Sequence, residues 1–219
     1  MSAAAIVAAA GAGNRAGTGD IPKQFRPLAG KPLLRWSVDV LRDVCDEVVV
    51  VAPRAHVDDA RSMCGTDVKV VAGGPTRQVS VANGLSEVDT VHVIVHDAAR
   101  PFVTKELVVA VITALDGVDA AIAAVPATDT LKDVQDARVR RTVERSSLWM
   151  AQTPQAFITA QLRRAHERAA LDKIDFTDDA ALIEHAGGSV AVVEGDLRNI
   201  KLTTAADFAL AESIAASLQ

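Results

Sequence analysis

The chain has little cysteine and no tyrosine. Its 219 residues include two cysteines, Cys45 and Cys64, and aromatic residues make up 3%. The cysteines show neither a CxxC spacing nor a Cys/His ligand spacing, so the pattern does not indicate a metal or redox motif. We expect both to be reduced, buried thiols, and a disulfide or metal role is the less favoured alternative. A chain of this length buries a core that needs no such cross-link.

Long apolar runs and a positive charge excess are also absent. No stretch approaches the roughly 18 apolar residues of a membrane helix, so we expect no membrane partner. Ala3–Ala10 is apolar, but no positive segment precedes it and a glycine loop follows, which favours a buried strand over a signal peptide. The formal net charge of −5 disfavours a general attraction to nucleic acid, and an anionic substrate would need local cations. We expect a cytoplasmic protein.

Short apolar runs alternate with longer segments of helical character. The predicted strands are Ala4–Ala9, Glu47–Ala52, Val68–Ala72, Val91–His96, Ala120–Val125 and Val190–Val193. The predicted helices are Pro32–Arg42, His56–Met63, Arg77–Leu85, Lys105–Leu115, Ala160–Ala170, Asp178–Ala186 and Ala205–Ser217. Near-continuous apolar strands such as EVVVVA are typical of parallel sheets covered on both faces. We therefore expect one domain over residues 1–219, an α/β three-layer α/β/α sandwich with a Rossmann-like, mostly parallel sheet. Ligands bind such sheets at the carboxyl ends of the strands.

One segment, residues 127–145, does not follow this alternation. It contains two short alternating pieces around a polar turn, VQDAR, which predicts a β-ribbon that protrudes from the body. Because a lone hairpin is only marginally stable in water, we expect the ribbon to pack on something, and a second subunit is the natural candidate. A flexible surface loop is the equally weighted alternative.

The first loop carries the strongest functional signal. In AAIVAAAGAGNRAGTGDIPKQF, an apolar strand leads into a glycine-rich loop with two cations, Arg15 and Lys23. Glycines let the backbone approach phosphate oxygens, so the loop indicates polyphosphate binding. The spacing of Gly11, Gly13 and Gly17 imitates a dinucleotide-binding fingerprint. However, no helix follows at once, and the second strand ends in Pro-Arg rather than an acidic residue, which disfavours an oxidoreductase.

Further polar clusters follow other predicted strands. In VHDAARPF, Asp97 at a strand end with Arg100 nearby suits a Mg²⁺-bridged phosphate. From these residues alone, the stronger interpretation is structural: Asp97 pairs with Arg100 or caps the next helix. We interpret His96 as a strand-end residue with a structural hydrogen bond. In GGPTRQVS, Arg77 and Ser80 begin a helix, and capping and ligand contact are equally plausible.

Near the end of the chain, Lys201 by itself is an ordinary lysine, and Thr177 before two aspartates predicts a helix N-cap. No Ser/His/Asp or Cys/His arrangement is apparent in the sequence. Cations and one carboxylate around a phosphate loop therefore favour phosphoryl or nucleotidyl transfer.

Taken in order, these motifs resemble one family over essentially the whole chain. The motifs AAAGAGNRAG…PKQF, GGPTRQVS, HDAARPF, DT, ERSSLWMAQTPQAF, TDDA and NIKLTT are similar to those of the 2-C-methyl-D-erythritol 4-phosphate cytidylyltransferases. The resemblance implies a nucleotidyltransferase-type fold, and transfer of CMP from CTP to methylerythritol 4-phosphate with release of pyrophosphate. It implies Mg²⁺ as cofactor, other divalent cations being possible, and direct attack on the α-phosphorus without a covalent enzyme intermediate. It also implies a homodimer in which the ribbon serves the active site of the other subunit.

The resemblance also implies a role for each matching residue. The catalytic cations would be Arg15, Lys23 and Lys201. The nucleotide would contact Ala9, Ala10, Gly11, Gly13, Gly74 and Ser80. The acceptor would contact Asp97, Arg100, Thr130, Arg145 and Thr153, with Asp97 also holding the metal.

Two residues depart from the family pattern. Asn14 replaces an arginine of some members, which thins the positive charge there, and Pro75 has no N–H for a contact with the base. The alternative substrate is ribitol 5-phosphate, which a sister family uses, and the alternative class is a nucleotide-binding domain without turnover. HDAARP, the TDDA helix start and ERSSLW favour the methylerythritol enzyme.

Overall fold

The chain is built around a seven-stranded sheet. A computed structural model describes residues 2–11 and 21–218. The strand order is β11-β7-β10-β6-β1-β4-β5. The strands are β1 (Ala3–Ala8), β4 (Glu47–Ala52), β5 (Lys69–Ala72), β6 (His92–Asp97), β7 (Ala120–Pro126), β10 (Trp149–Ile158) and β11 (Val190–Glu194). Only β10 pairs antiparallel within this sheet, so the prediction of a mostly parallel sheet is confirmed.

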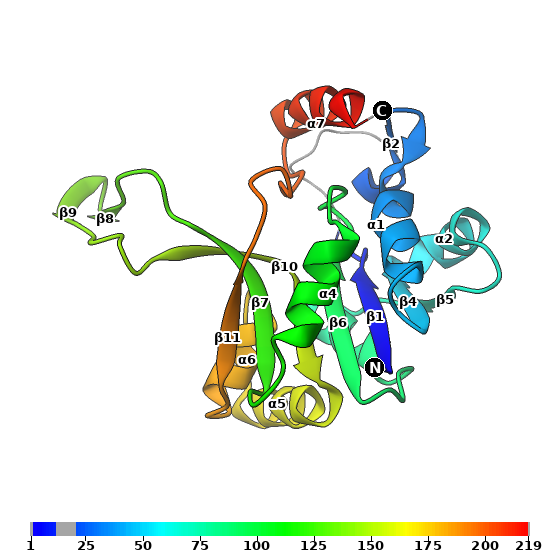
Figure 1. Cartoon of the computed structure of the whole chain (residues 1–219), viewed down its shortest axis with the longest axis horizontal. Helices are drawn as coiled ribbons and strands as arrows, with labels where there is room; N and C mark the ends of the chain where they lie inside the picture. The colour runs from blue at the N-terminus through cyan, green and yellow to red at the C-terminus, as the bar shows by residue number, and fades with distance from the viewer. Residues whose placement is uncertain (1, 12–20, 219) are drawn as a thin grey trace.

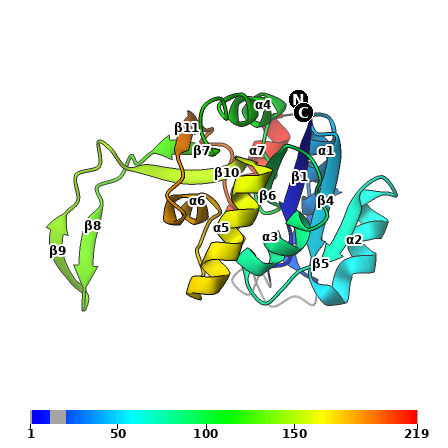
Figure 2. The same ribbon diagram turned by 90° about the horizontal axis from the view of Figure 1, so that it is seen from below.

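Helices cover both faces of the sheet, as Figure 1 and Figure 2 show together. One face carries α1 (Leu33–Arg42), α2 (Val57–Cys64) and α4 (Lys105–Thr113), and the other carries α3 (Arg77–Leu85), α5 (Thr159–Asp172) and α6 (Ala180–His185). Along β1, alternate residues enter opposite cores: Ala5 and Val7 pack toward α1, whereas Ala4 and Ile6 pack toward α3. A strand buried on both faces needs apolar residues at every position, which is why this run is continuously apolar.

The central antiparallel strand β10 was not among the predicted strands. It lies between β6 and β7, and its register shifts between Ala151 and Gln155. Its middle contains Pro154 and the buried polar side chains of Gln152, Thr153 and Gln155. Because proline and polar residues are disfavoured in a central strand, the sequence pattern conceals this element.

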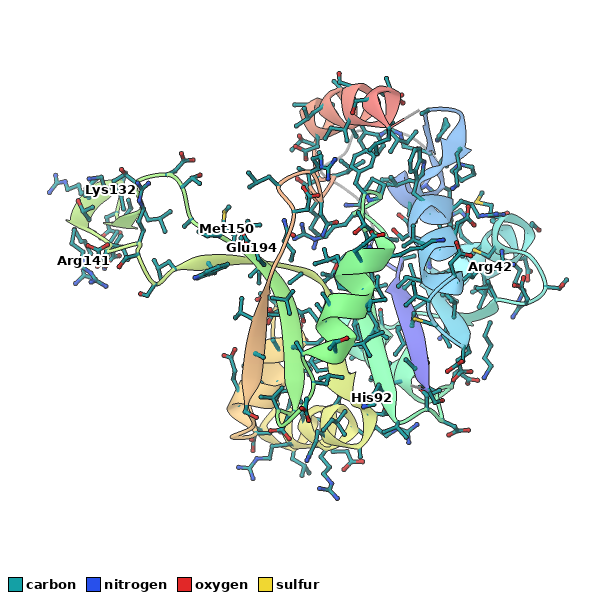
Figure 3. The ribbon with its side chains drawn as sticks, in the orientation of Figure 1. Arg42, His92, Lys132, Arg141, Met150 and Glu194 are labelled. Carbon is teal, nitrogen blue, oxygen red and sulfur yellow. The ribbon has the colours of Figure 1, made fainter. Side chains whose placement is uncertain are left out.

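The segment over residues 127–145 forms the predicted β-ribbon, which we call the arm. Its strands β8 (Lys132–Gln135) and β9 (Arg138–Thr142) pair only with each other. Asp136 and Ala137 join them with positive φ angles of 51° and 61°, as a two-residue hairpin turn requires. The arm projects from the sheet in Figure 1 and Figure 2, and Figure 3 shows Lys132 and Arg141 at its far end.

A small third core closes the end of the sheet where the parallel strands finish. Helix α7 (Ala205–Ser217) packs with Phe208 and Ala211 against Leu28 and Leu33 near the short strands β2 (Pro27–Leu28) and β3 (Lys31–Pro32). Thr204 and Asp207 form a reciprocal capping box at the start of α7. Two single-turn helices, η1 (Lys23–Phe25) and η2 (Arg54–His56), complete the described elements. None of the described helices is long and apolar enough to cross a membrane.

The two cysteines are free and buried, which confirms the expectation for both. Burial raises the pKa of Cys45 to about 12 and that of Cys64 to about 11. Both side chains therefore stay protonated and pack as small apolar groups in the core between the sheet and helices α1, α2 and α4.

Candidate active site

A cavity of about 580 Å³ lies at the carboxyl ends of the parallel strands. Its wall comes from the residues that follow β1, β5 and β6, together with η1 and the segment before α7. The lining residues are Ala8, Ala9, Ala10, Gly11, Lys23, Gln24, Gly74, Pro75, Thr76, Arg77, Ser80, Asp97, Ala98, Ala99, Lys201 and Thr203. Figure 3 labels His92 at the start of β6, which is the opposite end of that strand from the cavity.

Parallel pairing and one close approach of the backbone shape this wall. Ala8 and Asp97 are register partners on β1 and β6, so both strands reach the cavity together. The turn after β5 comes so near the first loop that a Cβ on Gly73 would lie 2.3 Å from the Cβ of Ala10. Gly73 also donates its N–H to the Ala52 carbonyl at 2.8 Å. This position accepts only glycine, and the adjacent Ala10 is small for the same reason.

Asp97 lies at the centre of the charged groups. It is 7% exposed, and its two oxygens contact two cations: Nζ of Lys201 is 2.6 Å from Oδ2, and Nε of Arg77 is 3.1 Å from Oδ1. Burial by itself raises the pKa of Asp97, but Arg77 and Lys201 outweigh it and hold that pKa well below its usual range. Asp97 is therefore an anion at neutral pH, although it is buried.

Arg77 is shared with a second buried carboxylate. Its Nη1 is 2.7 Å from Oδ2 of Asp179, which is 1% exposed. Burial lowers the pKa of Arg77, but Asp179 and Asp97 raise it by more, so the net effect is a raised pKa and the guanidinium stays charged. For Asp179, burial is the largest effect and raises the pKa, while Arg77 opposes it. The two carboxylates thus flank one arginine of the cavity wall.

His96 anchors the backbone behind Asp97. Its Nε2 donates to the Arg100 carbonyl at 3.0 Å, and its Nδ1 accepts from the Thr153 hydroxyl at 3.1 Å. That hydroxyl oxygen accepts in turn from the Asp97 N–H at 3.0 Å. These roles require a neutral ring, and burial lowers the pKa of His96 to about 4. The structural hydrogen bond predicted for His96 is confirmed.

Arg100 and Asn199 join the strand ends to the C-terminal segment. Arg100 donates from Nη1 to the Asn199 carbonyl at 2.8 Å and from Nη2 to the Ala151 carbonyl at 3.3 Å. The Asn199 side-chain amide donates to the Thr153 carbonyl at 2.8 Å. The interpretation of Arg100 as the partner of Asp97 is wrong, because Arg77 and Lys201 occupy both carboxylate oxygens.

The structure brings together most of the residues singled out in the sequence. Those that line the cavity are Ala9, Ala10, Gly11, Lys23, Gly74, Ser80, Asp97 and Lys201. Arg100 and Thr153 do not line it but are bonded to groups around it. Thr130 and Arg145 are exposed residues near the base of the arm and are not part of this chain's cavity. Gly13, Gly17 and Arg15 lie outside the described residues.

Sequence reasoning missed the central role of Arg77 and Asp179. Arg77 appeared as the start of a helix, with capping and ligand contact equally plausible, and Asp179 only as an acid near another helix start. The predicted N-cap at Thr177 is wrong: α6 begins after Asp179, and Asp178 accepts from the Ala181 N–H at 3.1 Å. One signal was available, because Arg77 is a cation at a helix N-terminus, where the helix dipole disfavours it.

Comparison with known proteins finds similarity to one family over nearly the whole chain. The family model described as 2-C-methyl-D-erythritol 4-phosphate cytidylyltransferase matches residues 3–217. A protein of that name from Aquifex aeolicus is 42% identical over 96% of this chain and 96% of its own length. Another, from Geotalea uraniireducens, is 41% identical over 100% of this chain and 98% of its own length. The crystal structure of the Thermus thermophilus protein of that name has a TM-score of 0.86 at 36% identity, covering 99% of this chain and 100% of that chain.

Acid should destabilise the fold through His96. Between pH of about 6.5 and about 4 the unfolded chain binds a proton at this residue that the folded chain does not, so stability falls as the pH falls. The pKa difference corresponds to about 3 kcal/mol of unfolding free energy. His96→Gln keeps a donor for the Arg100 carbonyl but does not titrate, and urea unfolding at about pH 7 and about pH 4.5 measures the change for both proteins. We expect a clearly smaller loss in the variant, and an equal loss in both would contradict the assignment.

Proposed function

This chain belongs to the 2-C-methyl-D-erythritol 4-phosphate cytidylyltransferase family, and from that premise we propose that it transfers CMP from CTP to methylerythritol 4-phosphate. The products are 4-diphosphocytidyl-2-C-methyl-D-erythritol and pyrophosphate, in the non-mevalonate route to isoprenoid precursors. The single observation that carries the proposal is the cavity itself. It combines small, backbone-rich walls on one side with Lys23, Arg77 and Lys201 around a buried carboxylate on the other.

The backbone-rich side suits the nucleoside. Ala9, Ala10 and Gly11 leave β1 without bulky side chains, and Gly74 and Ser80 face them. The Ser80 hydroxyl accepts from the Gly74 N–H at 3.1 Å, which holds the turn after β5 in place. We propose that these residues, with Gly13, surround the cytosine and ribose. Pro75 also lines the cavity and offers no N–H, so any recognition of the base there uses its neighbours.

The cationic side suits the reacting phosphates. Nζ of Lys23 donates to the Leu202 carbonyl at 2.9 Å, next to Lys201 in sequence, so the first loop and the C-terminal segment meet there. We propose that Lys23, Lys201 and Arg15 bind the triphosphate. An oxygen of the acceptor phosphate forms a bond to the α-phosphorus, the bond to the bridging oxygen of the β-phosphate breaks, and pyrophosphate leaves with that electron pair. Cations that stabilise the pentacoordinate phosphorus and the leaving group lower the barrier.

Asp97 fits a divalent cation that arrives with the nucleotide. Among the described residues, no three His, Cys, Asp or Glu side chains gather into a metal cage. Mg²⁺ commonly takes one or two carboxylates and completes its shell with substrate phosphates and water. Asp97 is the one carboxylate among the described lining residues, so we propose it as the protein ligand of Mg²⁺ or a similar ion. Such an ion would neutralise phosphate charge when bound.

The arm supports a dimer with shared active sites. It carries the exposed apolar side chains of Val134 and Val139, 54% and 61% exposed, on a hairpin that pairs with no other strand of the described residues. A two-stranded ribbon of this size needs a packing partner. We propose that residues 127–145 clasp a second subunit, where Thr130 and Arg145 bind the acceptor alongside that subunit's Thr153 and Arg100. Residues 1–219 then act as one cytidylyltransferase domain, which we expect in the cytoplasm.

The acceptor can be identified by pyrophosphate release. We expect release with CTP and methylerythritol 4-phosphate, and at most weak release with ribitol 5-phosphate, because the family match is to the methylerythritol enzyme. A coupled phosphate assay with each alcohol phosphate measures both rates. Release only with ribitol 5-phosphate would reassign the substrate. No release with either, despite CTP binding, would favour a domain without turnover.

Removal of either lysine of the cavity, Lys23 or Lys201, should impair catalysis more than folding. We expect Lys23→Ala and Lys201→Ala each to lower kcat by about 100-fold, because each removes a cation that acts on transition-state charge. Arg198→Ala is the matched control: Arg198 is exposed, pairs with Asp196 and does not line the cavity. Steady-state kinetics and circular dichroism give both readouts. Near wild-type turnover of a lysine variant would refute the role of that lysine.

Mixing inactive variants tests site sharing. Lys201→Ala disables the cavity of its own chain, whereas Arg145→Ala disables the arm, so a mixed dimer regains one intact site. With random exchange of subunits, about one quarter of wild-type activity should return. Mixing Lys201→Ala with Lys23→Ala is the control, because both changes affect the cavity and no dimer is then intact. If no activity returns although subunit exchange is demonstrated, the result would count against shared sites.

A further inference from the structure

Asp179 is a buried carboxylate that neither lines the cavity nor belongs to the proposed binding set. It is 1% exposed, lies at the start of α6 and contacts Arg77. Among the described residues, Arg77 is the only cation within ion-pair distance of Asp179. Burial of a carboxylate is costly, so a position that keeps one has a reason beyond filling space.

Arg77 is held from both sides. Nε contacts Asp97 at 3.1 Å, whereas Nη1 contacts Asp179 at 2.7 Å. A planar guanidinium anchored at one edge presents its other N–H groups in a fixed direction. The orientation of the Asp97 carboxylate in the cavity therefore depends on the Arg77 plane, and that plane depends on Asp179.

The chain around Asp179 is tied to the same two elements. Gln78, next to Arg77 in α3, accepts from the Phe176 N–H at 2.9 Å and donates to the Ile174 carbonyl at 3.2 Å. On β10, Gln155 accepts from the Ala180 N–H at 3.2 Å. These bonds place the segment 174–180 against α3 and β10, so Asp179 has a defined position from which to act.

We propose that Asp179 is a positioning residue, which holds the Arg77 guanidinium so that Arg77 fixes the Asp97 carboxylate for the reaction. The proposal rests on the role given to Asp97 in the proposed function. Asp179 touches neither substrate, and its whole effect on turnover passes through Arg77. Removing one partner of a buried ion pair also destabilises the fold, so the folding of each variant is measured beside its turnover.

Two substitutions at position 179 test whether Arg77 needs an oxygen from this side chain or only a side chain of similar size. Asp179→Leu removes the carboxylate that pairs with Nη1 of Arg77, and we expect kcat to fall by about 10- to 100-fold. Asp179→Asn keeps an oxygen for Nη1, and we expect it to retain most of kcat. Arg77→Lys is a second route, which does not depend on how well Asp179→Leu folds. A lysine replaces the two separate nitrogens that contact Asp97 and Asp179 with one ammonium group and loses the planar fork, so we expect a loss of kcat similar to that of Asp179→Leu. Wild-type kcat for both Asp179→Leu and Arg77→Lys would overturn the proposal.

A double-mutant cycle tests whether Asp179 acts through Arg77. In an Arg77→Gln background, Asp179→Leu should change kcat by less than about twofold, because the connection is already broken. Equal fold-losses in both backgrounds would mean an independent structural effect and would overturn the proposal. Asp175→Leu is the matched control: Asp175 is exposed and accepts from the Thr76 hydroxyl at 3.2 Å, so this change breaks a different bond between the same segments. We expect its kcat to be near wild type.

A crystal structure of Asp179→Leu gives a readout that does not depend on turnover. We expect the Arg77 side chain to swing away from its present plane and the Asp97 carboxylate to rotate with it. An unmoved Asp97 would overturn the positioning role. If the wild-type protein released no pyrophosphate, the proposed function would fail, while the position of Asp97 would still decide this inference.

Discussion

The arrangement of the site depends on one buried anion, Asp97. A carboxylate at the end of the central strand β6 is tolerated in the interior only if cations accompany it. Those cations come from distant parts of the chain: Arg77 lies 20 residues before Asp97, and Lys201 lies 104 residues after it. Their pairing with Asp97 draws α3 and the segment before α7 to the same edge of the sheet. The charge that folding must compensate is therefore also what gathers positive groups where we propose that the triphosphate binds.

The space for a ligand arises from the opposite kind of residue. Around Ala10 and Gly73 the backbones approach so closely that a single added Cβ would clash. Small residues at the ends of β1 and β5 keep the main-chain groups accessible, while larger side chains fill the two cores below. Peptide groups recognise a nucleoside without occupying the volume that it needs. The cavity thus lies where the large side chains of the strands give way to small ones.

Most of the fold could be predicted because its parallel strands are nearly continuous apolar runs, as in Glu47–Ala52, and its helices alternate with them. The arm was also visible, since its two pieces alternate around a turn. Strand β10 was not, because Pro154 and the polar residues around it are atypical of a central strand. The site shows the same division. Motif order predicted the lining glycines and lysines, whereas Arg77 and Asp179 acquire their importance only from a contact between segments about a hundred residues apart, which no local pattern encodes.

Strand β10 physically links the two proposed halves of the function. Its first residues, Trp149 and Met150, pair with the end of β7 where the arm leaves the sheet, and Figure 3 labels Met150 in this region. Its later residues pair with β6, and between these two parts Thr153 bonds to the Asp97 N–H. One continuous strand therefore runs from the base of the arm to the buried anion. Next to the arm, β10 pairs with β7 alone, whereas beyond the register shift it pairs with both β6 and β7. A partner that binds the arm would therefore contact an element that is joined to the site along a single strand.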